Sequence, residues 1–227
     1  MSQEKIYDDF FGILTNHNKL NELTPLPDNE TSSDDEALKS LKAATGSFDQ
    51  RSKADLNIHE STDYEVLMRI FEDIYINPDD TIVDFGCGMG RVLFYCNNRF
   101  FCNVKGIEIN PDVYKALFDN AENYHTKFME QRDKFSILNI HASEYEIAPT
   151  DNFFYFFNPF SADVLEGIIK KIMKSVHENL RQITIILYYC TFEMMSVIRK
   201  FPLRLEKVIK LPGYDEDPDE KAYIYML

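Results

Sequence analysis

Short apolar runs alternate, along most of the chain, with segments in which apolar residues recur every three or four positions. The runs favour strands and the wider spacing favours helices. The expected strands cover residues 81–85, 103–111, 134–141, 151–160, 182–190, 203–211 and 222–227. Helices are expected before the first strand and at 92 onward, 112–131, 162–180 and 192–201. This alternation predicts an α/β fold that closes with a hairpin of its last two strands.

The most apolar run, five aromatic residues at 153–157, is bounded by polar residues before it and by Asn158-Pro159 after it. Such a continuous run is typical of a central parallel strand, which is buried on both faces. In an open α/β sheet, the carboxyl ends of the strands border the ligand crevice. Asn158, Pro159 and Phe160 are therefore expected beside a bound substrate.

A second signal follows the first expected strand, where Asp84 precedes glycines at every second position. Glycine permits backbone conformations that are closed to other residues and lets main-chain N–H groups approach a ligand. At the start of the next helix, such groups favour a carboxylate or phosphate. A G-x-G-x-x-G fingerprint fails because its third glycine would fall on Arg91 or Leu93, and the Gly-Lys-Ser/Thr of a P-loop is missing. The motif is instead D-x-G-x-G-x-G.

Asp84, Gly86, Gly88 and Gly90 match, position by position, the first motif of the class I S-adenosylmethionine-dependent methyltransferases, which this chain resembles. The resemblance implies a three-layer sandwich whose seven-stranded, mostly parallel sheet ends in an antiparallel hairpin. It implies S-adenosyl-L-methionine as cofactor, S-adenosyl-L-homocysteine as product, and no metal. The backbone of the glycine loop, Cys87 included, would hold the methionine part. Asp84 would orient the loop or receive the cofactor's ammonium group.

The resemblance extends to the ends of the second and third strands. Glu108, which with Ile109 ends the second strand, would accept hydrogen bonds from both ribose hydroxyls. At the adenine end the family usually has an aspartate followed by a small residue, where this chain has His141 and Ala142. Ala142 can still offer its backbone N–H. The role of His141 is left open, with a surface histidine as the simpler interpretation.

Asn158, Pro159 and Phe160 resemble a shortened form of the Asn/Asp-Pro-Pro-Tyr/Phe motif of methyltransferases that act on amino or amide nitrogens. By this resemblance Asn158 would accept a hydrogen bond from the acceptor nitrogen, and Phe160 would stack on a flat substrate or pack against a cation. One proline is missing, which favours a protein or small-molecule acceptor over nucleic acid. The alternative is a strand end followed by a turn.

The chain is expected to divide into an acidic N-terminal helical extension, residues 1–57, and a domain resembling the methyltransferases, residues 58–227. Up to residue 63 there are 13 acidic and 6 basic residues, a net charge of 6 − 13 = −7. The extension is expected either to lie over the cofactor as a lid or to be a partly flexible leader. Thr62 and Tyr64 are candidates for contacts with the methionine end of the cofactor, or else a helix cap and a packing residue. Arg91 could pair with a carboxylate of the cofactor or substrate, but the simpler expectation is that it faces solvent.

The net charge and the cysteine content narrow the classes of partner that this chain is expected to bind. A net charge of −14 argues against a nucleic-acid surface, because such surfaces neutralise phosphates with Lys and Arg. The four cysteines show no metal-binding or C-x-x-C spacing. Neither a signal peptide nor a membrane-spanning run is evident. We therefore expect a cytoplasmic protein without membrane contact, of an oligomeric state that the sequence does not indicate.

The expected function is direct in-line methyl transfer to a nitrogen, and two alternatives stay open. A catalytically silent cofactor-binding subunit or sensor would keep the glycine loop and Glu108 without using Asn158. A nucleic-acid amino-methyltransferase would need a basic face or a target-recognition domain, and the sequence shows neither.

Overall fold

A computed structural model describes residues 62–127 and 129–227. The predicted extension, residues 1–57, lies outside these residues. The expectations of a lid or of a partly flexible leader therefore also concern residues that the structure does not describe.

Seven strands form one sheet in the order β3-β2-β1-β4-β5-β7-β6. β7 runs antiparallel to both of its neighbours, and the other pairs are parallel. The strands are β1 (Thr81–Phe85), β2 (Asn103–Ile107), β3 (Phe135–Leu138), β4 (Phe153–Phe157), β5 (Thr184–Tyr188), β6 (Arg204–Lys210) and β7 (Lys221–Met226). The sheet confirms the predicted seven strands and the closing hairpin.

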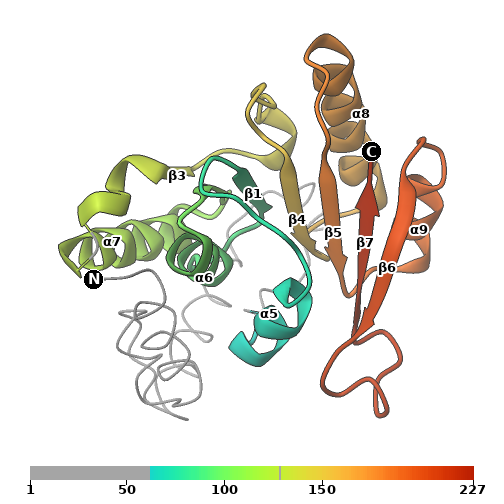
Figure 1. Cartoon of the computed structure of the whole chain (residues 1–227), viewed down its shortest axis with the longest axis horizontal. Coiled ribbons are helices and arrows are strands. Elements are labelled where there is room, and N and C mark those ends of the chain that lie inside the picture. Colours follow the sequence, from blue (N-terminus) through green and yellow to red (C-terminus); the bar gives the residue numbers. More distant parts are fainter. Residues whose placement is uncertain (1–61, 128) are drawn as a thin grey trace.

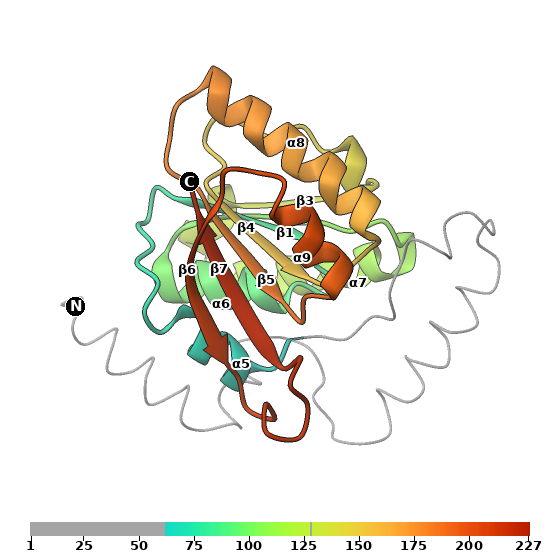
Figure 2. The same ribbon diagram turned by 90° about the vertical axis from the view of Figure 1, so that its right-hand side faces the viewer.

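Helices cover both faces of this sheet, which makes the expected three layers (Figures 1 and 2). One face carries α8 and α9, and the other carries α5, α6 and α7 (Figure 2). Two separate apolar cores lie between these layers and the sheet. The helices are α5 (Tyr64–Phe71), α6 (Arg91–Phe100), α7 (Pro111–Lys127), η2 (Met129–Lys134), η3 (Ala142–Glu144), α8 (Ala162–Glu178) and α9 (Phe192–Ile198).

β4 occupies the centre of the sheet, between β1 and β5, as its apolar run predicts. Every residue of β1 and β5 is buried, and so are four of the five in β4. Phe85 of β1 and Phe156 of β4 stack in parallel, with ring centroids 5.0 Å apart. Aromatic burial of this kind supplies a large part of the stability of a core.

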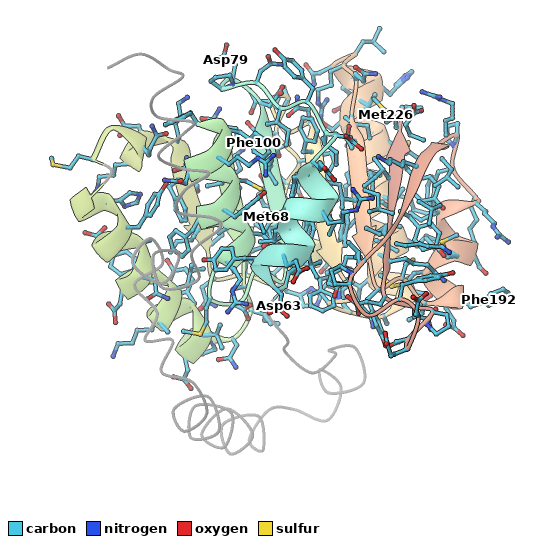
Figure 3. All side chains as sticks on the ribbon, turned by 60° about the horizontal axis from the view of Figure 1, so that its bottom comes forward. Asp63, Met68, Asp79, Phe100, Phe192 and Met226 are labelled. Atoms are coloured by element: carbon cyan, nitrogen blue, oxygen red, sulfur yellow. The ribbon has the colours of Figure 1, made fainter. Side chains whose placement is uncertain are left out.

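The segment that carries α5 runs across one face of the sheet before β1 begins. Asp63 and Asp79 lie at its opposite ends, with Met68 between them (Figure 3). Asp63 is the N-cap of α5, without a side-chain capping bond. The helix therefore begins where expected but ends at Phe71, earlier than its apolar spacing predicts.

Side-chain capping explains two other boundaries. Asn110 Oδ1 accepts hydrogen bonds from the N–H groups of Asp112 and Val113 at 3.0 and 3.3 Å, so α7 begins at Pro111. β3 is shorter than its predicted range, and it ends at Leu138. Beyond Leu138 the side-chain amide of Asn139, in place of a backbone N–H, donates hydrogen bonds to the carbonyls of Glu108 and Ile109.

β6 is an edge strand, as predicted, but its alternating pattern does not give a buried face. Leu205 and Val208 are 46% and 45% exposed, and Ile209 is the buried residue of the strand. The pairing with β7 shifts between Leu205 and Lys207. Because side chains alternate with a period of two, one extra residue changes the face that every later side chain occupies.

Candidate active site

Four parallel strands end at the same edge of the sheet. Phe85 pairs with Ile107 of β2 and with Phe156 of β4, and Phe157 pairs with Tyr188 of β5. The segments that follow these strands therefore lie next to one another at the carboxyl edge. They contain most of the residues that the sequence singles out.

The glycine loop after β1 is held by the backbone of β2. The N–H groups of Gly86 and Cys87 both donate to the carbonyl of Ile107, at 2.9 and 3.1 Å. The N–H of Gly90 donates back to the carbonyl of Cys87 at 2.9 Å. Gly86, Gly88 and Gly90 have φ values of +80°, +54° and +89°, which residues with a side chain rarely adopt.

The loop is also packed too closely for side chains. A β-carbon on Gly86 would come within 2.7 Å of Pro159 Cβ, and one on Gly90 within 2.4 Å of Leu117 Cδ1. The first contact joins the loop after β1 to the turn after β4. The two motifs found separately in the sequence therefore touch in the structure.

Glu108 lies at the end of β2 and is 5% exposed. Its Oε2 accepts a hydrogen bond from Gly88 N at 3.0 Å, and its Oε1 accepts one from Asn110 N at 2.8 Å. Each carboxylate oxygen has a second lone pair. The side chain therefore fixes the glycine loop and can still accept hydrogen bonds from a ligand's hydroxyls. Ile109, beside it, contributes its carbonyl to the bond from Asn139.

Asp84, the last polar residue of β1, is 3% exposed. Burial raises the pKa of its carboxyl well above the usual range, and the charge of Glu108 raises it further. Within the described residues no hydrogen-bond donor offsets these two effects. A buried acid beside a second acid is a favourable place for a cationic group, which would stabilise the ionised form.

Cys87 contributes to this site through its backbone. Its Sγ lies 2.7 Å from the position that a β-carbon on Gly106 would take, and the side chain is 8% exposed. Burial raises the pKa of the thiol well above its usual value, and the charges of Asp84 and Glu108 act in the same direction. The thiol is therefore neutral and a poor nucleophile.

Thr62 and Tyr64 lie close to the start of α6. The Thr62 hydroxyl is buried against the hydroxyl of Tyr155, 3.0 Å away. Arg91 Nη1 donates to the carbonyl of Thr62 and to Asp63 Oδ1, both at 3.3 Å, and its Cζ lies 5.3 Å from the centroid of the Tyr64 ring. The expectation that Arg91 faces solvent is wrong, because this side chain is 19% exposed and ties α6 to α5.

His141 and Ala142 follow β3 at the same edge. His141 Nδ1 accepts a hydrogen bond from Ser143 N at 3.2 Å and pairs with the Ser143 hydroxyl at 2.6 Å. His141 thus caps the short helix η3, a role that its sequence position did not suggest. Ala142 is buried in the core beneath α8.

The turn after β4 contains the candidate acceptor residues. Asn158 is half-buried and has a left-handed backbone with φ of +37°. Pro159 lies against Gly86. Phe160 is 4% exposed and packs edge-on against Phe156, with ring centroids 6.0 Å apart. Its ring belongs to the core, so of the three residues Asn158 has the side chain best suited to meet a ligand.

Two residues that support the site were not singled out from the sequence. Tyr155 meets Thr62, but it stands inside an aromatic run that predicts only core packing. Tyr189, after β5, is the register neighbour of Asn158, since Phe157 pairs with Tyr188. The φ of Tyr189 is +52°, which no pattern in the sequence indicates.

Residues 62–127 and 129–227 contain no group of three or more His, Cys, Asp or Glu side chains placed to hold a metal ion. They contain no helix long and apolar enough to cross a membrane.

Comparison with curated proteins gives two partial matches, and no protein-family model matches the chain. Over 72 residues, 32% of this chain, it is 35% identical to the H3 lysine-79 specific histone-lysine N-methyltransferase of Dictyostelium discoideum. Over 78 residues, 34% of this chain, it is 35% identical to the geranyl diphosphate 2-C-methyltransferase of Streptomyces ambofaciens. The chain spans only 4% and 25% of the lengths of these two relatives.

Among solved structures, a putative rRNA-methylase from Clostridium thermocellum has a similar fold. The TM-score is 0.51 at 15% sequence identity, and the match covers 73% of this chain and 96% of that one. The chain therefore has the fold of the class I, Rossmann-like S-adenosylmethionine-dependent methyltransferases.

Proposed function

We propose that this chain is an S-adenosylmethionine-dependent methyltransferase that transfers a methyl group directly to a nitrogen atom of a protein or a small molecule. The observation that carries the proposal is the close approach of Gly86 and Pro159, which joins the glycine loop to the Asn158 turn. A cofactor on the loop would face an acceptor on the turn. The two curated relatives are both methyltransferases by name, which supports the reaction class.

The residues of the loop fit this cofactor. Backbone N–H groups at the start of α6 suit its carboxylate. The remaining lone pairs of Glu108 suit the ribose hydroxyls. Asp84 suits a positively charged group, because its buried carboxylate has no donor within the described residues. Thr62, Tyr64 and Ala142 remain candidates for further contacts.

When bound, S-adenosylmethionine supplies a methyl group on a positively charged sulfur, which keeps the electron pair of the C–S bond as the N–C bond forms. The protein must then align a neutral acceptor nitrogen and exclude water, and such positioning is worth several kcal/mol. The amide oxygen of Asn158 would accept a hydrogen bond from that nitrogen and so direct its lone pair. After transfer, once the product meets solvent, the methylated nitrogen would release its proton to water.

A nitrogen acceptor is favoured by Asn158 and by the relative whose name specifies lysine N-methylation. The net charge of −14 favours a basic protein or a cationic small molecule over RNA. The other relative is named as a C-methyltransferase, so the acceptor atom has to be measured.

The test is incubation with methyl-labelled S-adenosylmethionine and a heat-treated cell extract, which is afterwards separated into protein, nucleic acid and small molecules. We expect label in protein or small molecules, on nitrogen. Label confined to nucleic acid would overturn the acceptor class. Cofactor binding by calorimetry without label in any fraction would favour a silent subunit.

The best control variant is Asn158→Gly. Asparagine tolerates a left-handed backbone better than most residues, so Asn158→Ala would combine a lost side chain with new strain. Glycine removes the amide and keeps the backbone. We expect Asn158→Gly to bind the cofactor like the wild type and to lose most of the transfer.

A further inference from the structure

Asn158 and Tyr189 are neighbours at the point where β4 and β5 end. Phe157 and Tyr188 are the last paired residues of these parallel strands, and the next residue on each strand turns into the left-handed region. Their φ values are +37° and +52°. Adjacent parallel strands lie about 5 Å apart, so the two unusual residues stand side by side at the candidate acceptor turn.

The two residues differ in how well their chemistry suits this conformation. Asparagine is several-fold enriched there, whereas a bulky tyrosine is a genuine outlier. Such a residue is strained and persists only where its surroundings hold it. Glycine at position 189 would remove that strain. The tyrosine therefore needs an explanation other than backbone stability.

Three contacts hold Tyr189 in place. Its backbone N–H donates to the carbonyl of Lys221 at 3.1 Å, one residue beyond the β5–β7 pairing. Its hydroxyl donates to the Asp217 carboxylate. Its ring stands edge-on to Tyr188, at 6.2 Å between centroids, and Tyr188 in turn stacks on Phe157 at 4.2 Å.

Asp217 belongs to the loop between β6 and β7, which leaves the sheet at the same end as the tips of β4 and β5 (Figure 1). The loop fixes Asp217 through a bond from its N–H to the Gly213 carbonyl at 2.9 Å and one from Asp219 N to its Oδ1 at 3.0 Å. The bond to Asp217 raises the pKa of Tyr189 to about 12, so the phenol stays protonated and continues to donate.

We propose that Tyr189 is an acceptor-positioning residue, whose half-buried ring, fixed by Asp217, forms the wall of the acceptor subsite beside Asn158. The inference rests on the proposed function and names the second residue of that site. An aromatic face beside the amide restricts where an acceptor nitrogen can sit, favours an alkyl or cationic substituent on it, and excludes water. The strain at Tyr189 is retained because the ring is needed there.

Tyr189→Gly tests this role, because glycine keeps the backbone conformation and removes the ring. We expect an unfolding temperature equal to or above that of the wild type and a cofactor Kd within twofold of it. Transfer of label to the extract, at saturating cofactor, should fall at least tenfold in maximal rate. Tyr189→Phe and Asp217→Asn, which keep the ring and weaken its attachment, should show smaller losses.

Phe101→Gly is the matched control. Phe101 also has a left-handed backbone, with φ of +55°, but it follows α6 at the opposite edge of the sheet. This variant relieves the same kind of strain and should transfer at the wild-type rate. Wild-type transfer by Tyr189→Gly would overturn the inference, and so would a loss of cofactor affinity that parallels the loss of transfer. If the wild type itself labels nothing, the proposed function falls and this inference with it.

Discussion

The carboxylate of Glu108 accepts a hydrogen bond from the backbone N–H of Gly88 at 3.0 Å, so the acid that ends β2 holds the loop that follows β1. Its other oxygen holds Asn110, at the start of α7. One side chain thus connects the ends of two strands. A ligand that bonds to Glu108 would be positioned by the same atoms that shape the glycine loop.

Glu108→Gln should weaken cofactor binding. The amide has one oxygen in place of two, so its NH₂ group would face a backbone N–H at either Gly88 or Asn110. Charge-assisted hydrogen bonds are worth about 1.5–3 kcal/mol, which predicts a loss of about 10- to 100-fold in affinity by calorimetry. Glu144→Gln, at an exposed position of η3, is the control and should bind normally. Unchanged affinity in Glu108→Gln would contradict the role given to this residue.

Gly86→Ala should disrupt the site by displacing its backbone. The new β-carbon would lie 2.7 Å from Pro159, at a φ of +80°, so either the loop or the Asn158 turn has to move. We expect a destabilisation on the order of 1–3 kcal/mol and loss of cofactor binding and transfer. Gly167→Ala, in α8 with nothing within 4 Å of the added carbon, should instead stabilise the protein by about 1 kcal/mol. Thermal unfolding and calorimetry of both variants make the comparison.

The features that could be predicted from the sequence are those that neighbouring residues determine locally. The glycines, the run at 153–157 and Asn110-Pro111 each determine a local structure, so the strands, the glycine loop and the start of α7 were predicted correctly or within a few residues. The order β3-β2-β1-β4-β5-β7-β6 was not predicted, and the family resemblance supplied only the mostly parallel sheet and its closing hairpin. Periodicity alone does not specify which strands pair.

Most of the features that were wrong or missed depend on contacts between residues distant in sequence. Arg91 is 28 residues from Asp63, and only the packing of α5 on α6 brings them together. The exposed face of β6 results from a shift in its pairing with β7. His141 caps η3 through Ser143, two residues away, yet an isolated histidine gives no signal for this role. The strain at Tyr189 depends on its position at the end of β5 and beside β7.

The four cysteines should be unreactive in the native protein. All are free and buried, and burial raises the pKa of Cys102 and of Cys190 to about 12 and that of the other two thiols well above the usual value. Because the thiolate is the reactive species, a chromogenic disulfide reagent at pH 8 should react slowly, at the rate at which the protein opens. In denaturant four thiols should react at once. Rapid reaction of one native thiol would contradict the buried position of that cysteine.

Asp84→Asn should stabilise the protein without its cofactor. Asp84 has a raised pKa in the folded state, so between the ordinary carboxyl value and this raised value the native protein holds a proton that the unfolded chain has lost. Stability therefore falls as pH rises through that interval and levels off above it. The asparagine variant has no such dependence. Its advantage in unfolding temperature should be absent near pH 4 and should grow toward neutral pH, while its affinity for S-adenosylmethionine should fall.

Asp151 provides the contrast, because it is equally buried but fully bonded. Its carboxylate meets Lys105 Nζ at 2.7 Å, the Tyr145 hydroxyl at 2.8 Å and Ala148 N at 2.7 Å, near the amino end of β4 and away from the glycine loop. Asp151→Asn leaves the half-buried Lys105 without its counter-charge and the buried Tyr145 hydroxyl and Ala148 N–H with a weaker acceptor, and we expect a loss of about 3 kcal/mol. Opposite shifts of the two variants in thermal unfolding at pH 7 are the expected result. Destabilisation by Asp84→Asn would mean that Asp84 has a structural role, and it would remove the argument that its unpaired charge is kept for a cationic ligand.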